Sequence, residues 1–488
     1  MHNASIALSK KCMFEGVFKA LCLSSVVAFG SFSSHVLENK ESSFYQDYTS
    51  YKRADRTRLP IGIFDSGTGG LTVMSAIVKL DEFNNVTGDR GGDGIPDFQT
   101  EFFQYLADQA NMPYGLYGSE NNASLLKEHI VKDAHFLLGN TYYVTPQSEK
   151  YAVDKLPVKT LVIACNTATA YGKQDIETFI KKADLDTKVI GVIDAGVEAA
   201  LEQLGEDEDA TIAIFATVGT VASEGYVKTL KSLIQPLGKK GEISVVQQPG
   251  LGMAECIDGV KDYICSESDS ANRKYRGPSM ASAEEYRIKK DLLKVYNFED
   301  QGLVKKGDNV ELNSVKNYVR YHVVSLVEKV KAKKDAPPLQ SIILGCTHYP
   351  YIAEEIESTL NYLRDYQEDG VFVYRPYLKE KVELIDPAFN TALELYVTLR
   401  EDALFNSHGA IDNSSFFISV PNEANSNVES VDGAFTYQYK YGRKAGEIQE
   451  YTKRVPFKNG NIEESRLDEL TKALPEIGKL IKRDFERY

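Results

Sequence analysis

The sequence lacks the features of a membrane-spanning or polyanion-binding protein. No apolar run approaches the ~20 residues that a membrane-spanning helix needs. Positive charge is not in excess, because 56 Lys and Arg stand against 70 Asp and Glu, a net charge of −14 at pH 7. An acidic chain is repelled by nucleic acid and by anionic membrane surfaces, so we expect no nucleic-acid partner and no membrane span.

Cysteine is also scarce, and its spacing excludes several kinds of site. Six Cys in 488 residues are too few for a disulfide scaffold, although Cys256 and Cys265 could pair in an oxidising compartment. The sequence has no C-x-x-C motif, and its seven His form no H-x-x-x-H cluster. A redox dithiol and the common zinc motifs are therefore not expected.

The first residues follow the order of a secretory signal peptide. Lys10, Lys11 and Lys19 precede the apolar stretch 20–29, and the small residues of 30–34 follow it. We therefore predict a signal peptide over 1–34 and export, to the periplasm. The alternative is a cytoplasmic protein with a disordered start. Residues 35–58 are polar and predict a loose leader.

The remaining chain alternates strand and helix patterns. A content of 43% hydrophobic and 26% charged residues is that of a globular protein, and the length allows two to four domains. Alternating β and α elements predict an α/β fold of two similar lobes with mainly parallel sheets and an active site in the cleft between them. The first lobe is predicted over 59–192, with insertions near 84–100 and 139–158, and the chain returns to it over 381–440. The second lobe is predicted over 193–380, with an insertion at about 258–336. Residues 441–488 are predicted to form an extension with an amphipathic helix kinked at Pro475.

Two of the predicted strands end in a cysteine. The apolar run 161–164 is followed by Cys165, and the apolar run 342–344 is followed by Gly345 and Cys346. A single Cys in such a place is most often a small buried hydrophobe. Two copies, each followed by hydrogen-bonding side chains, favour a different interpretation. Because strand carboxyl ends line the ligand crevice of an open parallel sheet, we expect the two thiols to face one another across a substrate.

Two opposed thiols suit the inversion of a stereocentre. A thiolate on one face can remove a proton, a thiol on the opposite face can deliver one, and the roles exchange in the reverse direction. Neighbouring Asp, Glu or His side chains can orient the thiols and influence their protonation.

Two loops have ligand-binding patterns of lower specificity. Residues 65–70 (Asp-Ser-Gly-Thr-Gly-Gly) form a glycine-rich turn between a strand and a helix, which suits an anion, either a carboxylate or a phosphate. The spacings of nucleotide-binding glycine loops are absent. Asp89, Asp93 and Asp97, with Gly94 at the sixth position, have the alternation of a calcium loop; a solvated acidic turn is the alternative.

Four motifs together resemble glutamate racemase, of the aspartate/glutamate racemase superfamily. They occur in the family's order within the region from about 59 to 440, and they are Asp-Ser-Gly-Thr-Gly-Gly at 65–70, Met-Pro-Tyr-Gly at 112–115, Ala-Cys-Asn-Thr-Ala at 164–168 and Leu-Gly-Cys-Thr-His-Tyr-Pro at 344–350.

The resemblance implies a racemase that needs no cofactor and acts on glutamate or a close relative such as aspartate. A homodimer is one candidate assembly, and the sequence does not give the oligomeric state. Cys165 and Cys346 would be the two acid/base groups, with Asp65 assisting Cys165, and with His348 and Glu255 assisting Cys346. The residues that would hold the substrate are Ser66, Pro113, Tyr114, Gly115, Asn166, Thr167 and Thr347. Family members supply D-glutamate for cell-wall peptidoglycan in the cytoplasm.

The sequence also departs from the family. Residues 106–111 replace the usual Gly-Asp-Thr-x-Arg approach to the Pro-Tyr-Gly turn, and the insertions make the chain far larger than usual. Three alternatives therefore stay open: a racemase for another amino acid such as aspartate, a non-catalytic two-lobed solute-binding relative, and a related enzyme such as a hydantoin racemase or a C–N lyase.

Overall fold

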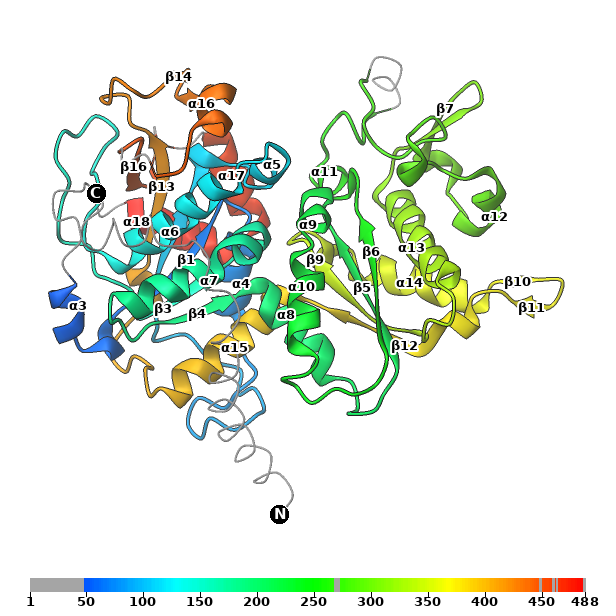
Figure 1. Ribbon diagram of the computed structural model, residues 1–488, viewed down its shortest axis with the longest axis horizontal. Helices are drawn as coiled ribbons and strands as arrows, with labels where there is room; N and C mark the ends of the chain where they lie inside the picture. The colour runs from blue at the N-terminus through cyan, green and yellow to red at the C-terminus, as the bar shows by residue number, and fades with distance from the viewer. Residues whose placement is uncertain (1–47, 267–272, 447–449, 459–460, 462–463, 486–488) are drawn as a thin grey trace.

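The computed structural model describes residues 48–266, 273–446, 450–458, 461 and 464–485. The predicted signal peptide and the first part of the leader lie outside these residues. Figure 1 shows two lobes side by side, each built around its own sheet. Across the described residues, no helix is both long and apolar enough to cross a membrane.

The first lobe contains a mainly parallel sheet. Among the described residues it has six strands in the order β16-β13-β2-β1-β3-β4. Strand β16 runs antiparallel to β13, and the other pairs are parallel. The strands are β1 (Ile61–Asp65), β2 (Phe103–Ala107), β3 (Thr160–Ile163), β4 (Lys188–Gly191), β13 (Ser415–Pro421) and β16 (Thr452–Pro456).

Helices cover both faces of this sheet, and the alternation of strand side chains shows which core each face joins. Ile61, Ile63 and Val162 pack in one core, whereas Phe64 and Leu161 point to the other. The first core receives α4 (Leu71–Lys79), α8 (Val192–Glu202), α15 (Pro387–Glu401), α17 (Glu464–Ala473) and α18 (Pro475–Phe485). The second receives α6 (Ala123–Leu138) and α7 (Asn166–Lys182). Burial on both faces explains why these strands are apolar throughout.

The second lobe contains a parallel sheet with the strand order β12-β9-β5-β6 within the described residues. The strands are β5 (Ala210–Ala216), β6 (Ile243–Pro249), β9 (Leu339–Gly345) and β12 (Leu378–Ile385), and the helices around them are α9 (Val218–Ser223), α10 (Gly225–Leu233), α11 (Met253–Ile257), α13 (Val315–Ala332) and α14 (Ala353–Asp365). Helices α13 and α14 pack on one face with Phe215 and Leu344.

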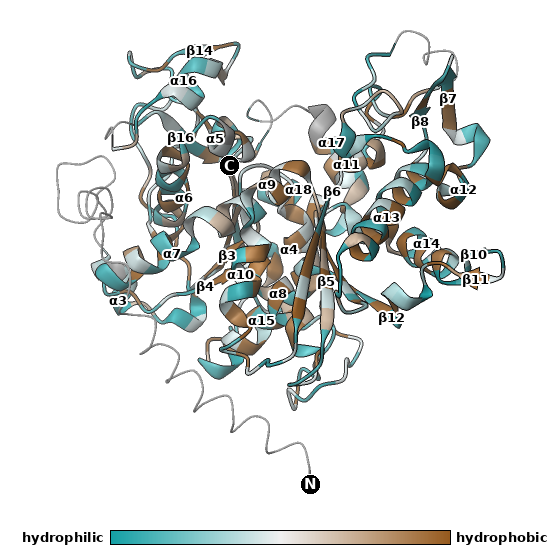
Figure 2. Ribbon diagram, turned by 45° about the vertical axis from the view of Figure 1, so that its right-hand side comes forward, coloured by the Kyte–Doolittle hydropathy of each residue, from teal (hydrophilic) through white to brown (hydrophobic). Residues whose placement is uncertain are grey.

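The other face of the second sheet joins the core of the first lobe. Ile212, Ile214 and Ile343 belong to the same buried cluster as the side chains of α8 and α15. Figure 2 shows β5 and the neighbouring α8 coloured as largely hydrophobic where the lobes meet. The lobes are therefore joined by continuous apolar packing as well as by the chain.

The α/β fold with two mainly parallel sheets is as the sequence predicted, whereas some elements differ. Strands β13 and β16 were not predicted, and β16 lies in the segment interpreted as an extension. Strand β4 ends at Gly191, because Val192 already begins α8. Pro475 does not kink one helix; it begins α18, a position where its missing N–H costs nothing. The exact lobe boundaries stay predictions.

The described part of the leader is not loose. Tyr48 precedes the short helix α3 (Thr49–Arg53) and Tyr51 lies within it, and both side chains are buried in the first lobe. The Tyr51 hydroxyl lies 2.5 Å from the Thr187 hydroxyl, and Lys52 pairs with Asp184 at 2.9 Å. The aromatic rings of Tyr48 and Tyr51 therefore attach this polar segment to the core of the first lobe.

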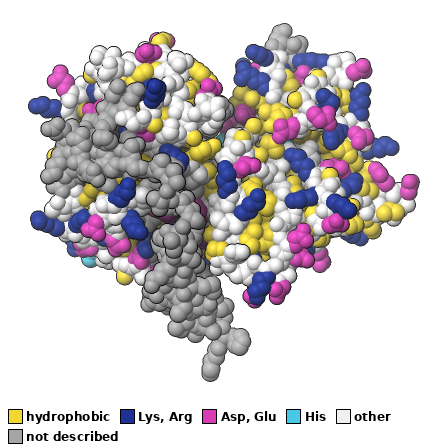
Figure 3. All heavy atoms as spheres, in the orientation of Figure 1, with side chains coloured by type: hydrophobic (Ala, Val, Ile, Leu, Met, Phe, Trp, Pro, Cys, Tyr) yellow, Lys and Arg dark blue, Asp and Glu magenta, His cyan; other side chains and the backbone are white. Residues whose placement is uncertain are grey.

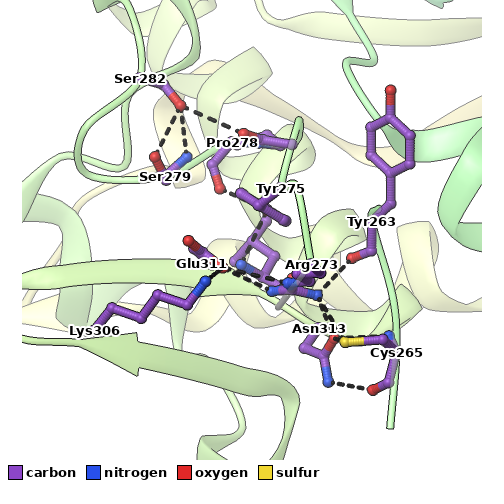
Figure 4. Close-up of polar contacts among 12 residues, drawn as sticks. Tyr263, Cys265, Arg273, Tyr275, Pro278, Ser279, Ser282, Lys306, Glu311 and Asn313 are labelled. Carbon is purple, nitrogen blue, oxygen red and sulfur yellow. Dashed lines mark hydrogen bonds and ion pairs between the residues drawn. The ribbon is translucent and has the colours of Figure 1, made fainter. Parts of the chain in front are cut away.

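A network of polar contacts organises the insertion of the second lobe. Arg273 pairs with Glu311 at 3.1 Å and donates to Asn313 at 2.6 Å, and Lys306 also pairs with Glu311 (Figure 4). This network joins Cys265 and Arg273 to the hairpin of β7 (Leu303–Lys306) and β8 (Asn309–Leu312) and to Asn313 after it. Cys256 and Cys265 are both free thiols in this structure, so the pairing that the sequence allowed does not form.

The remaining described elements are short. They are α5 (Gly115–Ser119), α12 (Leu293–Tyr296), α16 (Tyr437–Gly442) and the two-stranded pairs β10 (Gln367–Glu368) with β11 (Val371–Phe372) and β14 (Ser430–Val431) with β15 (Ala434–Phe435).

A buried ion pair beneath the first sheet yields a stability prediction. Lys159 and Glu101 lie just before β3 and β2, are fully buried, and approach to 2.8 Å; Lys159 also donates to the carbonyl of Leu404. Lys159→Ala leaves a buried carboxylate without its cation, so we expect it to lower the free energy of unfolding by about 3–5 kcal/mol in urea. Lys240→Ala, which breaks the exposed pair with Glu206, is the matched control and should have no measurable effect. Equal effects of the two substitutions would contradict this account.

Candidate active site

The strand ends of the two lobes face one another. Asp65 ends β1, Cys165 follows β3, and Cys346 follows β9. The side chain of Asn166, next to Cys165, donates from Nδ2 to the carbonyl of Gly345, next to Cys346, at 3.3 Å. A hydrogen bond between the neighbours of the two cysteines places both thiols on opposing sides of one junction.

Glycines allow the lobes to approach closely around this junction. A β-carbon on Gly69 would lie 3.4 Å from Asp65 Oδ2 and 3.9 Å from Thr347 Oγ1, so the turn after Asp65 lies beside the residue after Cys346. A β-carbon on Gly115 of α5 would lie 3.9 Å from the Cα of Gly219 in α9. Figure 3 shows the groove between the lobes on one face, with charged side chains of both signs on either side.

Cys165 lies in an environment that keeps its thiol protonated. It is 7% exposed and occupies the N-cap of α7, where Sγ accepts the amide of Ala168 at 3.5 Å and donates to the Ser66 hydroxyl at 3.8 Å. Burial, followed by the negative charge of Asp65, raises the pKa of Cys165 to about 12. At neutral pH this side chain is therefore a proton donor.

Asp65 itself is held by the glycine-rich turn. One carboxylate oxygen accepts the Ser66 amide at 2.7 Å, and the other accepts the Gly70 amide at 2.8 Å. The turn therefore presents Asp65 beside Cys165 in one orientation.

Cys346 lies in the opposite kind of environment. Its Sγ is 3.5 Å from Nδ1 of His348, and Nε2 of His348 is 3.3 Å from Oδ1 of Asp258. The hydrogen bond to Asp258, followed by that to Cys346, raises the pKa of His348 to about 10 against the opposing effect of burial. An imidazolium is thus present at neutral pH, and a cation beside a thiol favours the thiolate.

The contrast between the two thiols indicates what the site can do. Two titratable groups of one type whose surroundings favour opposite protonation states are suited to act as acid and base. Cys165 carries a proton at neutral pH, and Cys346 contacts the protonated imidazole of His348. The arrangement can therefore remove a proton on one side of a bound molecule and deliver one on the other.

The structure brings together most of the predicted site residues. The sequence-predicted residues at the facing edges are Asp65, Ser66, Cys165, Asn166, Thr167, Cys346, Thr347 and His348. Pro113 forms a cis peptide with Met112, and this turn leads into α5, whose Gly115 contacts the second lobe.

The side chain of Tyr114, one of the residues predicted to hold substrate, lies inside the first lobe. It is 1% exposed, and its hydroxyl donates to Asp108 at 2.5 Å or to Asp133 at 2.6 Å. The phenol therefore belongs to the interior of the first lobe, because two buried carboxylates need a donor there. Only its backbone remains near the junction.

Glu255 is the other residue whose predicted role the structure does not show. It lies on α11, and its charge acts on Tyr349 and Cys256. The carboxylate that contacts His348 belongs to Asp258, three residues later. Residues at i and i+3 share a helix face, which is the signal that the sequence offered for Asp258.

Tyr226 is a second residue that was not assigned to the site. Its hydroxyl donates to Oδ1 of Asn166 at 2.8 Å, so both ends of the Asn166 amide are bound to the second lobe. A tyrosine that acts through a partner in the other lobe has no local sequence signal.

The acidic loop at 84–100 does not form the calcium site that was one of its two interpretations. The Asp93 carboxylate accepts a hydrogen bond from the Asn85 amide at 2.8 Å, and the Asp97 carboxylate accepts one from the Glu82 amide at 2.9 Å. The backbone carbonyl of Asp89 accepts one from the Asn84 amide at 2.9 Å. In the part of the chain that the structure describes, no three His, Cys, Asp or Glu side chains meet as a metal-binding group. The carboxylates of Asp93 and Asp97 instead satisfy backbone amides of the loop.

Comparison with known proteins gives a consistent set of relatives. No protein-family model matches the chain. It is similar to glutamate racemase of Clostridium novyi, with 25% identity over 369 residues, 75% of this chain and 94% of the relative. It is also similar to glutamate racemase of Lactobacillus acidophilus, with 24% identity over 347 residues, 71% of this chain and 83% of the relative. Among solved structures, a glutamate racemase isoform from Bacillus anthracis is 22% identical, covers 74% of this chain and 89% of its own, and has a TM-score of 0.43.

The effect of Asp65 on Cys165 can be measured without any substrate. Asp65→Asn removes the anion beside the thiol, so the pKa of Cys165 should fall and its thiolate fraction should rise. We expect alkylation of Cys165 by iodoacetamide at pH 9, followed by peptide mass spectrometry, to accelerate by roughly three- to tenfold, a pKa decrease of up to about one unit. Cys256, which is buried and donates to the carbonyl of Met253, is the internal control and should not change. A slower reaction of Cys165 in the variant would contradict this assignment.

Proposed function

The chain belongs to the aspartate/glutamate racemase superfamily, and we propose that it is a glutamate racemase that interconverts L- and D-glutamate with Cys165 and Cys346 as its two acid/base groups. The observation that carries the proposal is the hydrogen bond from Asn166 to Gly345, because it holds the two cysteine-bearing strand ends opposite one another. The reaction needs no resident cofactor, since both proton transfers use side chains of the chain itself.

The reaction follows from the two thiol environments. The Cys346 thiolate removes the proton from Cα of one enantiomer, and the electron pair of the C–H bond moves into the substrate carboxylate. The Cys165 thiol then delivers its proton to the opposite face of Cα. The product leaves with inverted configuration, and the enzyme is left with Cys346 as thiol and Cys165 as thiolate. This state is ready for the other enantiomer, so the two directions use the same groups in exchanged roles.

Substrate binding would use the polar groups at the junction. Ser66 in the glycine-rich turn, Asn166 and Thr167 at the start of α7, and Thr347 after Cys346 surround the two thiols. Helix N-termini and glycine-rich turns favour carboxylates because their amides point outward and carry partial positive charge. Because Asn166 already contacts Gly345 and Tyr226, a substrate that binds Asn166 must replace one of these hydrogen bonds.

The cellular setting is a separate proposal. We propose that the racemase supplies a D-amino acid for peptidoglycan, and that residues 1–34 direct it to the periplasm. Both proposals rest on the sequence alone.

The test follows proton exchange at Cα in deuterated water. The purified chain, with reductant, is incubated with L-glutamate or L-aspartate, and optical rotation and Cα deuterium are followed by NMR. Cys165→Ala and Cys346→Ala should each lower the rate by on the order of 10²- to 10⁴-fold, the contribution of one acid/base group. Cys256→Ala, at a buried thiol outside the junction, should retain activity.

The alternatives predict other outcomes. Exchange with aspartate but not with glutamate would replace the proposed substrate. Tight binding of an amino acid without exchange, unchanged in both cysteine variants, would identify a non-catalytic solute-binding protein.

A further inference from the structure

His348 lies between a catalytic thiol and a carboxylate that belongs to no motif of the sequence. We propose that Asp258 is a positioning residue for Cys346, because its carboxylate holds the His348 ring in the orientation and the charged form that stabilise the Cys346 thiolate. Its catalytic consequence rests on the proposed racemase function. The assignment replaces Glu255, which the sequence resemblance had associated with His348.

The geometry uses both nitrogens of the ring. Nε2 of His348 is 3.3 Å from Oδ1 of Asp258, and Nδ1 is 3.5 Å from Sγ of Cys346. A protonated imidazole is a donor at both nitrogens, so an acceptor at one end and a thiolate at the other satisfy it completely. Neutralising Asp258 removes the anion that favours protonation at Nε2, so the ring loses its positive charge more readily and no longer presents a cation to the sulfur of Cys346.

Asp258 and Glu255 differ in what they face. Asp258 follows directly on α11, in helical backbone conformation, one turn beyond Glu255. The charges that act on His348 are those of Asp258 and Cys346, whereas Glu255 acts on Tyr349, Cys256 and Tyr263. Thus the place of Asp258 at the end of α11 brings its carboxylate, and not that of Glu255, to the imidazole.

The exposure of the three groups fits this role. The Asp258 side chain is 52% exposed, whereas His348 is 30% exposed and Cys346 is buried. Solvent screens the attraction of a half-exposed carboxylate, so its direct effect on the thiolate is small. Its effect passes through His348, which lies close to both groups.

Among the described residues, the contacts of Cys165 are of another kind. There the thiol contacts Ser66 and the Ala168 amide, and the adjacent carboxylate of Asp65 disfavours the thiolate. The pair of Asp258 and His348 therefore distinguishes the surroundings of Cys346 from those of Cys165, and in the proposed reaction it favours Cys346 as the base of the resting enzyme.

The proposal has a pH signature. The raised pKa of His348, about 10, means that the imidazolium is present below that pH and is lost above it. Removing the Asp258 anion lowers the pKa of His348 toward the ordinary value for histidine, so the imidazolium is lost at lower pH. The alkaline limb of kcat should move in the same direction, because Cys346 then loses its neighbouring cation earlier.

The experiment compares Asp258→Asn with Glu255→Gln in the full chain. The imidazole signals of the seven His are followed by NMR between pH 6 and 11, with His348→Gln used to assign the His348 signal. We expect Asp258→Asn to lower the pKa of His348 by one unit or more, roughly a tenfold or greater change in its protonation equilibrium, and Glu255→Gln to leave it unchanged. Asp258→Glu, which keeps the charge, should restore most of the wild-type pKa.

Two further measurements separate positioning from a general structural role. Peptide mapping should show slower alkylation of Cys346 in Asp258→Asn at pH 8, with the rate at Cys265 unaltered. If racemisation is observed, kcat at pH 8 should fall roughly ten- to a hundredfold with KM within about twofold, because Asp258 does not touch substrate. Asp262→Asn, which removes a charge paired with Arg276 elsewhere in the insertion, should leave kcat unchanged.

The outcomes are distinct. A His348 titration that is the same in Asp258→Asn and wild type, or that moves in Glu255→Gln instead, overturns the proposal. If the wild-type chain racemises no amino acid, the proposed function fails, but lowered His348 pKa and slower Cys346 alkylation in Asp258→Asn still establish the role of Asp258 at the thiol. Equal loss of kcat in Asp258→Asn and Asp258→Glu would overturn it as well, because the charge would then not matter.

Discussion

The amide of Asn166 is the interaction on which the site depends, because it fixes the distance between the two lobes at the point of chemistry. Its nitrogen donates to Gly345 and its oxygen accepts from Tyr226, so one side chain of the first lobe is bound twice to the second. Each such bond contributes about 1 kcal/mol to stability, which is small beside the shared apolar core of the lobes. The core holds the lobes together, and the amide determines how their strand ends meet.

Burial and charge then make two identical side chains chemically different. Cys165 is enclosed by the first lobe beside a carboxylate, and both effects oppose its thiolate. Cys346 is equally buried but adjoins His348, which a carboxylate keeps protonated. A reaction that must take a proton from one side and return one on the other needs this inequality. The similar sequence patterns of the two strand ends do not indicate this difference between the thiols.

The added segments are attached by apolar packing as well as by polar contacts. In the insertion of the second lobe, Arg273 pairs with Glu311, and Val295 and Tyr318 pack in the core of that lobe. The leader buries Tyr51 in the first lobe, and α18 adds Ile477 and Ile481 to the main core. The enlargement therefore extends the existing cores, and Asp258, at the start of the insertion, reaches His348 at the junction of the strand ends.

The sequence alone determined the fold class, most strands of both sheets and the two cysteines, because each is encoded locally by an apolar run and the residues that end it. It could not indicate that Tyr114 turns its hydroxyl to buried carboxylates, or that Asn166 contacts Tyr226, because these contacts join residues far apart in the chain. The choice between Glu255 and Asp258 was likewise beyond it. Glu255 lies in α11 and Asp258 directly follows it, and only the tertiary structure decides which carboxylate reaches His348.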